Sequence, residues 1–311
     1  MIKEISVTNI GTGEQIEIGT EVPYFLESID WGNAEVKQTS YRVPFQIGQF
    51  QTGETVGTRD ITITGYVLAD NVVSDGKTWK QYFDDCEEKI NENKLVLDKI
   101  FSVYYNVLIR TGEYIIEGRP TTSVKYSTKE KENNEVLCLF SVVLKCFNPM
   151  FKKGTKKTEL ATTQEAIHFP LIIKEKNNIF GEILRRRSVS ITNDGNVESG
   201  CKITISADAG IVKNPKIYII QTEEYIQIED VELQVGDYIV ITTETGEENV
   251  ILHDASERTE TSIIGKVTNG SKYLKVKRGT YDYAYSVDEQ YQTNIGVTIE
   301  FKEQFFNIKG M

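Results

Sequence analysis

Residues 136–151 read VLCLFSVVLKCFNPMF, and this stretch predicts a strand that ends abruptly. Apolar side chains alternate from Val136 to Cys146, which is the period of a strand with one buried face. The run stops at Asn148-Pro149-Met150-Phe151, because proline cannot donate to a sheet ladder, and the polar stretch Lys152–Lys157 follows. The sequence therefore predicts the end of one β-rich unit and the start of another. Two β units joined in this way are typical of a structural protein and not of an enzyme with a central pocket.

The chain divides on this pattern into an N-terminal domain over 1–151, a polar Lys/Thr-rich linker over 152–165 and a C-terminal domain over 166–311. Its 311 residues are enough for two separate cores. Short alternating segments broken by Gly, Asp and Asn predict antiparallel strands at 5–10, 15–18, 24–31, 40–51, 59–68, 101–110, 114–118 and 135–147. The second half predicts strands at 168–173, 187–193, 201–207, 216–221, 225–228, 237–243, 248–254, 273–276, 283–286 and 295–301, and no convincing helix. The fold class is therefore mainly β, with a β-sandwich or jelly roll in the second half.

One segment has helical spacing. Between Thr78 and Asn91 the apolar residues recur at the helical period, and Thr78 with Gln81 forms a capping-box pattern. We expect one amphipathic helix laid against a sheet of the N-terminal domain, with Trp79 and Phe83 buried.

Composition indicates a folded protein with an acidic surface. Asp and Glu outnumber Lys and Arg by 46 to 35, giving a formal charge of −11, which argues against nucleic-acid binding over the whole surface. A local basic patch stays open at Arg185-Arg186-Arg187, where a solvated strand edge is the alternative. The four cysteines form no CxxC pair and are interpreted as small buried hydrophobes in a reducing cytoplasm. No signal-peptide core and no membrane-spanning apolar run are found.

The sequence predicts no catalytic residues, no metal site and no cofactor. Neither histidine, His168 or His253, has another His or a Cys close in sequence, and no G-x-S-x-G turn could hold a nucleophile. Gly11-Thr12-Gly13 lacks the remainder of a phosphate loop and is interpreted as a hairpin turn. Counting alone leaves a glycosidase carboxylate pair open, although the acidic residues lie mostly in turns or beside lysines.

Three tyrosines, Tyr281, Tyr283 and Tyr285, share one face of a predicted strand. They favour packing in the core or against another subunit, and stacking on a sugar ring remains the alternative.

A series of short motifs is shared, in order, with a known family. The first motifs are Arg59–Tyr66, with Gly65 near its end, the helix that follows, and the strand closed by Asn148, Pro149 and Phe151. The later motifs are the Asn193-x-Gly195 turn before Cys201–Ile205, then Gly236-Asp237, and finally the turn from Gly270 to Gly279. This order resembles the distal tail (Dit) proteins of long-tailed phages, which are siphovirus-type tail components. The family pattern has Asp-Pro-Phe where this chain has Asn148, Pro149 and Phe151 with Met150 inserted, and a proline before Ile203 that is missing here.

The resemblance implies a structural hub at the tip of a phage tail or phage-like tail, and no enzyme. The first half would form a ring, commonly a hexamer, and the second would be a galectin-like sandwich that projects outward, with the last strand returning to the first domain as an open alternative. The implied partners are other copies of the chain, the tail tube protein, the tail-tip protein and receptor-binding proteins. The implied location is the virion tail tip, assembled in the host cytoplasm. DNA would pass through the ring without specific binding, and acidic residues lining the lumen would repel it.

Two other functions stay open. The first is a carbohydrate-binding adhesin module that acts through the C-terminal sandwich, and the second is a wall-degrading enzyme. The hairpin tip at Lys129–Asn134 is interpreted either as a contact to a neighbouring ring or subunit or as an ordinary exposed turn.

Overall fold

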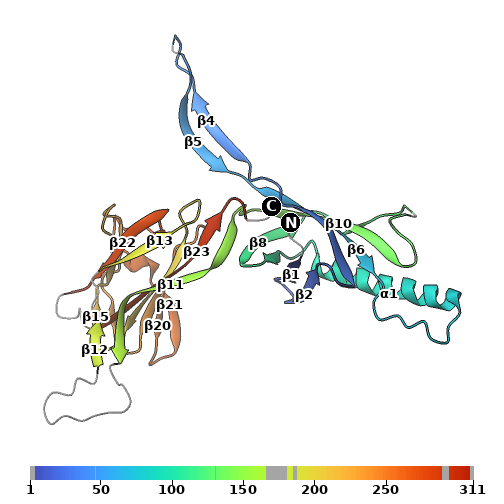
Figure 1. Cartoon of the computed structure of the whole chain (residues 1–311). Coiled ribbons are helices and arrows are strands. Elements are labelled where there is room, and N and C mark those ends of the chain that lie inside the picture. The colour runs from blue at the N-terminus through green and yellow to red at the C-terminus, as the bar shows by residue number, and fades with distance from the viewer. Residues whose placement is uncertain are drawn as a thin grey trace. The chain divides into compact units, whose positions relative to one another are not determined.

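The computed structural model describes residues 4–45, 47–129, 131–165, 181–184, 188–288 and 294–308. The fold is mainly β, as predicted, and the described residues contain one α-helix. The chain separates into two compact units (Figure 1). Unit 1 comprises the residues up to Lys153 together with the segment from Phe305 onward, and unit 2 comprises Gly154–Gln304.

Unit 1 contains antiparallel strands around one helix. Its elements are β1 (Ile5–Asn9), β2 (Gln15–Ile18), β3 (Tyr24–Asp30), β4 (Val36–Tyr41), β5 (Phe50–Val56), β6 (Arg59–Leu68), α1 (Trp79–Ile100), β7 (Val107–Thr111), β8 (Tyr114–Pro120), β9 (Lys125–Tyr126), β10 (Leu137–Cys146) and the start of β11 (Phe151–Glu165). The order β2-β1-β7-β8-β11 forms one layer, and β3, β6, β10 and β9 pair in turn beside it. Apolar residues of these strands and of α1 form a single core.

Strand β10 confirms the alternation that the sequence predicted. Cys138, Phe140, Val142, Leu144 and Cys146 are buried, and the residues between them are partly exposed. The strand pairs with β6 over ten residues, from Leu137 opposite Leu68 to Cys146 opposite Arg59. Two long strands with matching alternation can bury one continuous face, which explains why this pair lies at the centre of unit 1.

The segment expected to be a polar linker is a strand. Residues 152–165 belong to β11, and Lys152 and Lys153 pair with Ile115 and Tyr114 of β8. An antiparallel strand needs backbone partners and one buried face, and its other face can be polar throughout. The Lys/Thr-rich composition therefore concealed this strand, in which the described residues buried in a core are Phe151 in unit 1 and Leu160 in unit 2.

Helix α1 begins where the sequence placed it, and its buried face differs from the prediction. The Thr78 hydroxyl accepts a hydrogen bond from the Gln81 backbone N–H, and the Gln81 side chain accepts one from the Thr78 N–H, which completes the capping box. The helix runs to Ile100, nine residues beyond the predicted end. Its buried residues are Cys86, Ile90, Asn93, Leu97 and Ile100.

The prediction that Trp79 and Phe83 are buried was wrong. The Trp79 side chain is 75% exposed and Phe83 is 37% exposed. The first two turns carry no buried residue, so the layer of strands covers the helix only from Cys86 onward. The periodicity of apolar residues shows which side chains share one face of the helix. It does not show how far along the helix the sheet covers that face.

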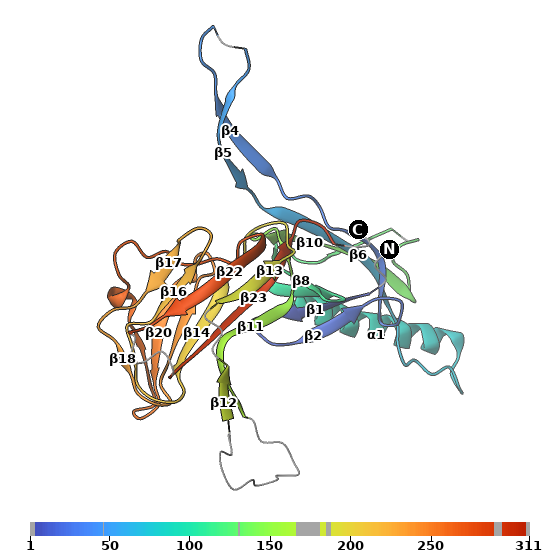
Figure 2. The same cartoon turned by 60° about the vertical axis from the view of Figure 1, so that its left-hand side comes forward.

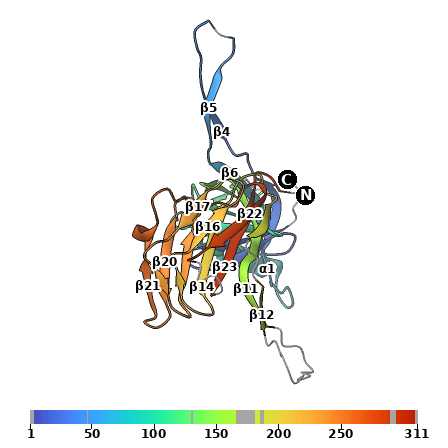
Figure 3. The ribbon, with the colours of Figure 1, turned by 90° about the vertical axis from the view of Figure 1, so that its left-hand side faces the viewer.

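Unit 2 consists of two larger antiparallel sheets and a separate pair of short strands around one core. Its elements are the remainder of β11, β12 (Gly181–Leu184), β13 (Ser188–Asn193), β14 (Cys201–Ala207), β15 (Val212–Lys213), β16 (Lys216–Ile219), β17 (Tyr225–Gln227), β18 (Glu232–Leu233), β19 (Tyr238–Thr242), β20 (Asn249–Asp254), β21 (Thr259–Ser262), the 3-10 turn η1 (Ile264–Lys266), β22 (Gly279–Ser286) and β23 (Ile295–Phe305). One sheet runs β11-β23-β14-β19-β20-β21 and the other β13-β22-β16-β17 (Figures 2 and 3).

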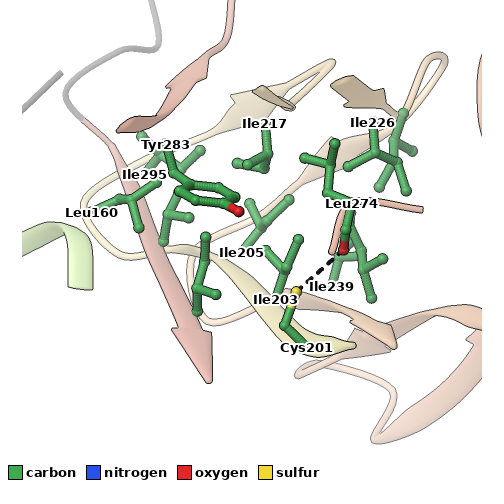
Figure 4. Packing of buried hydrophobic residues seen from close by; sticks show 14 of the residues in the cluster. Leu160, Cys201, Ile203, Ile205, Ile217, Ile226, Ile239, Leu274, Tyr283 and Ile295 are labelled. Carbon is green, nitrogen blue, oxygen red and sulfur yellow. Dashed lines mark hydrogen bonds between the residues drawn. The ribbon is translucent and has the colours of Figure 1, made fainter. Parts of the chain in front are cut away.

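The core of unit 2 draws on both sheets. Ile203 and Ile205 of β14 and Ile239 of β19 lie in the same cluster as Ile217 of β16 and Tyr283 of β22 (Figure 4). Facing sheets that share one apolar layer form a sandwich. The predicted strand over 273–276 is an extended segment outside the named strands, and the predicted strand over 168–173 lies outside the described residues.

Candidate interaction surfaces

Arg59, the first signature residue, is a buried cation inside unit 1. Its guanidinium donates to the backbone carbonyls of Trp31 (3.5 Å) and Phe306 (2.5 Å), and it lies 4.8 Å from the centre of the Phe151 ring. The Trp31 and Phe151 rings meet edge to face at 5.4 Å. Burial lowers the pKa of Arg59, while the neighbouring Cys146 acts in the opposite direction. Arg59 therefore links the start of β6, the start of β11 and the C-terminal segment.

Gly65 and Asn148 have local structural roles. A Cβ on Gly65 would lie 2.4 Å from the Phe25 carbonyl oxygen and 2.9 Å from the Phe140 ring, so the close packing of β3, β6 and β10 requires glycine there. The Asn148 side chain accepts a hydrogen bond from the Met150 N–H at 3.1 Å, and Pro149 is buried between them. This turn ends β10 and positions Phe151 as the first residue of β11.

Asn193 and Gly195 form a buried turn within unit 2. The Asn193 amide donates to the carbonyls of Val197 and Val276, both at 3.0 Å, and its side-chain oxygen accepts from the Gly195 N–H at 2.9 Å. A Cβ on Gly195 would lie 2.7 Å from the carbonyl oxygen of Gln304. The structure thus joins these two signature residues to each other, as it joins Arg59 to Phe151. Arg59, Phe151, Asn193 and Gly195 are buried within their own units, whereas Asn148 is exposed at its turn.

The tyrosines of β22 point into the core of unit 2. Tyr283 is fully buried, and its hydroxyl donates to the Lys275 carbonyl at 2.9 Å. Tyr281 and Tyr285 are partly buried and pack against the same cluster. Stacking of a sugar on Tyr283 is therefore wrong, because its ring faces have no access to solvent. Core packing, the other interpretation of these residues, is what the structure shows.

The histidine within the described residues, His253, lies near the end of β20 beside an aromatic ring and a carboxylate. His253 stacks on Tyr238 with ring centres 4.3 Å apart, and its Nδ1 lies 3.3 Å from Glu260. In the described ranges no group of three or more His, Cys, Asp or Glu could hold a metal, and no helix is long and apolar enough to cross a bilayer. His168 and the Arg185–Arg187 patch lie outside the described residues.

Exposed hydrophobic residues are concentrated in unit 1. In the part of the chain that the structure describes, the large exposed hydrophobics of unit 2 are Ile220, Val235, Tyr238 and Ile264. All the others lie in unit 1, on the β4–β5 hairpin, on the first and the later turns of α1, in the loops before α1 and before β7, and in or beside other strands. Exposed apolar residues that gather on one part of a protein mark surfaces for other proteins. Unit 1 therefore carries the candidate interaction surfaces.

Comparison with solved structures identifies the same architecture elsewhere. The SPP1 Dit protein, described as a paradigm of the hub adsorption apparatus in phages that infect Gram-positive bacteria, matches with a TM-score of 0.63 and 11% identity, covering 97% of this chain and 99% of that one. The chain has a Dit-like fold. A baseplate chain of phage P2 in its activated conformation with Ca also matches, with a TM-score of 0.48 and 11% identity, over 97% of this chain and 98% of that one. No family model matches the sequence, and no curated protein matches it.

Sequence reasoning missed the main exposed features of this Dit-like chain. Residues 40–51 were predicted as one strand, and the structure places the end of β4, a turn and the start of β5 there. Gly48, which has a positive φ of 96°, was the available signal for a turn in that segment. The aromatic first turn of α1 was predicted to be buried because a helix covered by a sheet over its whole length and one covered over half its length have the same apolar spacing in sequence.

Proposed function

We propose that the protein is a structural hub of a phage tail tip or of a phage-like tail. The observation that carries this proposal is the Dit-like fold, which extends over nearly the full length of both chains. Unit 1 would form a ring, commonly a hexamer, at the end of the tail tube, and unit 2 would be a galectin-like sandwich carried on that ring. The distribution of exposed apolar residues supports this division of roles, because a ring-forming unit needs adhesive surfaces and an outward-facing sandwich does not.

The hub would connect several components of the tail. Other copies of the chain complete the ring, the tube protein binds one side, and the tail-tip protein and receptor-binding proteins bind the other. The location is the virion tail tip after assembly in the host cytoplasm. DNA would pass through the ring without specific recognition, and the formal charge of −11 would oppose adhesion of phosphate to it.

Direct imaging tests the proposal. Purified full-length protein is examined by light scattering and negative-stain microscopy, and isolated tails are labelled with an antibody against the chain. Rings of uniform size, or label confined to the tail tip, are the expected results. A protein that is monomeric in solution and absent from isolated tails would contradict the hub function.

The two alternatives have separate readouts. Clearing of peptidoglycan by the purified chain would indicate a wall-degrading enzyme, which the hub proposal does not predict. Binding on a glycan array would favour an adhesin. Tyr238, which is exposed, is the position to vary in that test, because Tyr283→Ala would remove a core side chain.

A further inference from the structure

The hairpin of β4 and β5, residues 36–56, is called the arm here. Its two strands pair only with each other, and every residue of both is exposed. The arm presents six large apolar residues to solvent: Val36, Tyr41, Phe45, Ile47, Phe50 and Val56. Phe45 and Ile47, near the tip, are fully exposed. A two-stranded hairpin without a third layer is marginally stable in water, so the arm needs a surface to cover it.

A second exposed apolar surface lies on the first turns of α1. Trp79, Tyr82 and Phe83 contact one another, with ring centres 5.7–6.3 Å apart, and form a continuous group called the α1 patch. Trp79 is 75% exposed. Large aromatic side chains in contact at a surface are typical anchors of protein interfaces. The α1 patch therefore has the chemistry of a docking site for an apolar element.

Charge distinguishes the α1 patch from the exposed aromatic loop at Tyr104 and Tyr105 of unit 1. Glu87 continues the row of Trp79 and Phe83 at helical spacing, and in the described residues it forms no ion pair. Arg42 follows Tyr41 in the arm and also forms no described ion pair. Beside Tyr104, in contrast, Arg119 donates to the Val103 carbonyl at 3.0 Å and to the Tyr104 carbonyl at 3.4 Å. Arg42 of the arm is therefore complementary to Glu87 at the α1 patch, whereas Arg119 at the Tyr104 loop would repel it.

The arm and the α1 patch belong to the same unit, and Figures 1 and 2 show the arm projecting from unit 1 away from its own α1. A seven-residue strand spans about 23 Å, which is enough for the arm to reach a neighbouring molecule. Two different complementary surfaces on one chain produce a head-to-tail contact, and such a contact closes into a ring where its rotation brings the last copy back to the first. We propose that the arm of one copy docks on the α1 patch of the next copy. This inference rests on the proposed function, because it specifies how the ring would be held together.

A charge exchange in the full-length protein tests the pairing. Arg42→Glu and Glu87→Arg are each expected to weaken self-association roughly tenfold or more, because each places like charges in contact across the interface. The double variant restores opposite charges and is expected to recover most of the affinity. Sedimentation over a concentration series gives the association constants. The proposal would be overturned if the double variant lost as much binding free energy for self-association as the two single variants together, or more.

Apolar variants locate the surface. Trp79→Ser and Phe45→Ser are each expected to weaken self-association roughly 30-fold, the size of an interface hot spot. Leu95→Ser is the matched control, because Leu95 is 63% exposed on the same helix and lies far from the patch. Circular dichroism confirms that each variant is folded. If Tyr104→Ser weakens self-association and Trp79→Ser does not, the arm docks on the Tyr104 loop, and the proposal is overturned.

The outcomes separate this inference from the hub function. Rings that form normally in all these variants would overturn the arm docking and leave the hub function intact. If the wild-type chain is monomeric in solution, the same variants are scored by incorporation into isolated tails, where Trp79→Ser is expected to be lost and Leu95→Ser retained. Absence of the wild-type chain from both rings and tails would overturn both proposals.

Discussion

At the scale of single residues, six of the seven signature positions are buried and Asn148 is exposed. Arg59 is a cation placed among aromatic rings and backbone carbonyls, a position that no hydrophobic pattern could predict. Its importance was indicated only by the resemblance of its motif. The alternating apolar residues of β10, in contrast, follow directly from the sequence, because a two-residue period has one structural interpretation.

Replacing Arg59 with lysine tests the three-way link. A lysine ammonium has no planar fork, so it cannot hold the Trp31 and Phe306 carbonyls together. We expect the free energy of unfolding of unit 1 to fall by roughly 1–3 kcal/mol, the cost of a buried acceptor left unpaired. Hydrogen exchange should become faster in residues 305–308. Arg278→Lys, at an exposed arginine of unit 2, is the control and should change neither quantity.

The cysteines provide a pH-dependent prediction. Burial raises the pKa of the Cys146 and Cys201 thiols to about 12, and all four cysteines are buried. The native thiols should therefore not react with a thiol reagent at pH 8, and four should react after denaturation. Unfolded thiols ionise near pH 8.5, so the unfolded state loses protons first and stability should fall as the pH rises above that value. Rapid labelling of Cys146 or Cys201 in the native protein would contradict this prediction.

At the scale of elements, the fold was predictable where one face of a strand is apolar and was missed where it is not. The β6–β10 pair and the start of α1 follow from alternation and from the capping box. Strand β11 was missed because its lysines and threonines carry no alternating signal. The end of α1 was missed because the buried stripe continues through Asn93, whose amide donates to the Leu68 carbonyl and to Asp70.

Substitution of Gly65 tests the close packing of β3, β6 and β10. The added Cβ of Gly65→Ala would overlap the Phe25 carbonyl, so the strands must separate locally. We expect a loss of roughly 1–3 kcal/mol in the free energy of unfolding, in the range of core overpacking, measured by denaturant titration. Gly154→Ala is the matched control, because that glycine lies in a strand with open space around its Cα. Equal losses in the two variants would contradict the packing explanation.

At the scale of the whole molecule, unit 2 is inserted into unit 1. The chain leaves unit 1 after Lys153 and returns to it at Phe305. Ile308 is buried in the core of unit 1, and the Phe305 ring meets Tyr114 of β8 edge to face at 5.8 Å. The sequence indicated two β units, but the position of the return depended on contacts between residues far apart in the chain, which local patterns do not encode.

A chain that stops at Gln304 tests the contribution of the return segment. It lacks the buried Ile308 side chain and the Phe306 carbonyl that Arg59 binds. Calorimetry should show a lower melting temperature for unit 1, because buried apolar area and a partner of a buried cation are lost. Unit 2 keeps its full core and should melt unchanged. A change of melting temperature confined to unit 2 would contradict the assignment of the segment from Phe305 onward to unit 1.

The return of the chain to unit 1 also sets an order of events during synthesis. A ribosome adds roughly 5–20 residues per second, so the interval between Lys153 and Phe305 lasts on the order of ten seconds. During that interval unit 1 lacks the last part of its core, while unit 2 emerges and can fold. A nascent chain therefore cannot complete unit 1 before unit 2 has been translated, so each molecule with a finished unit 1 already carries both units.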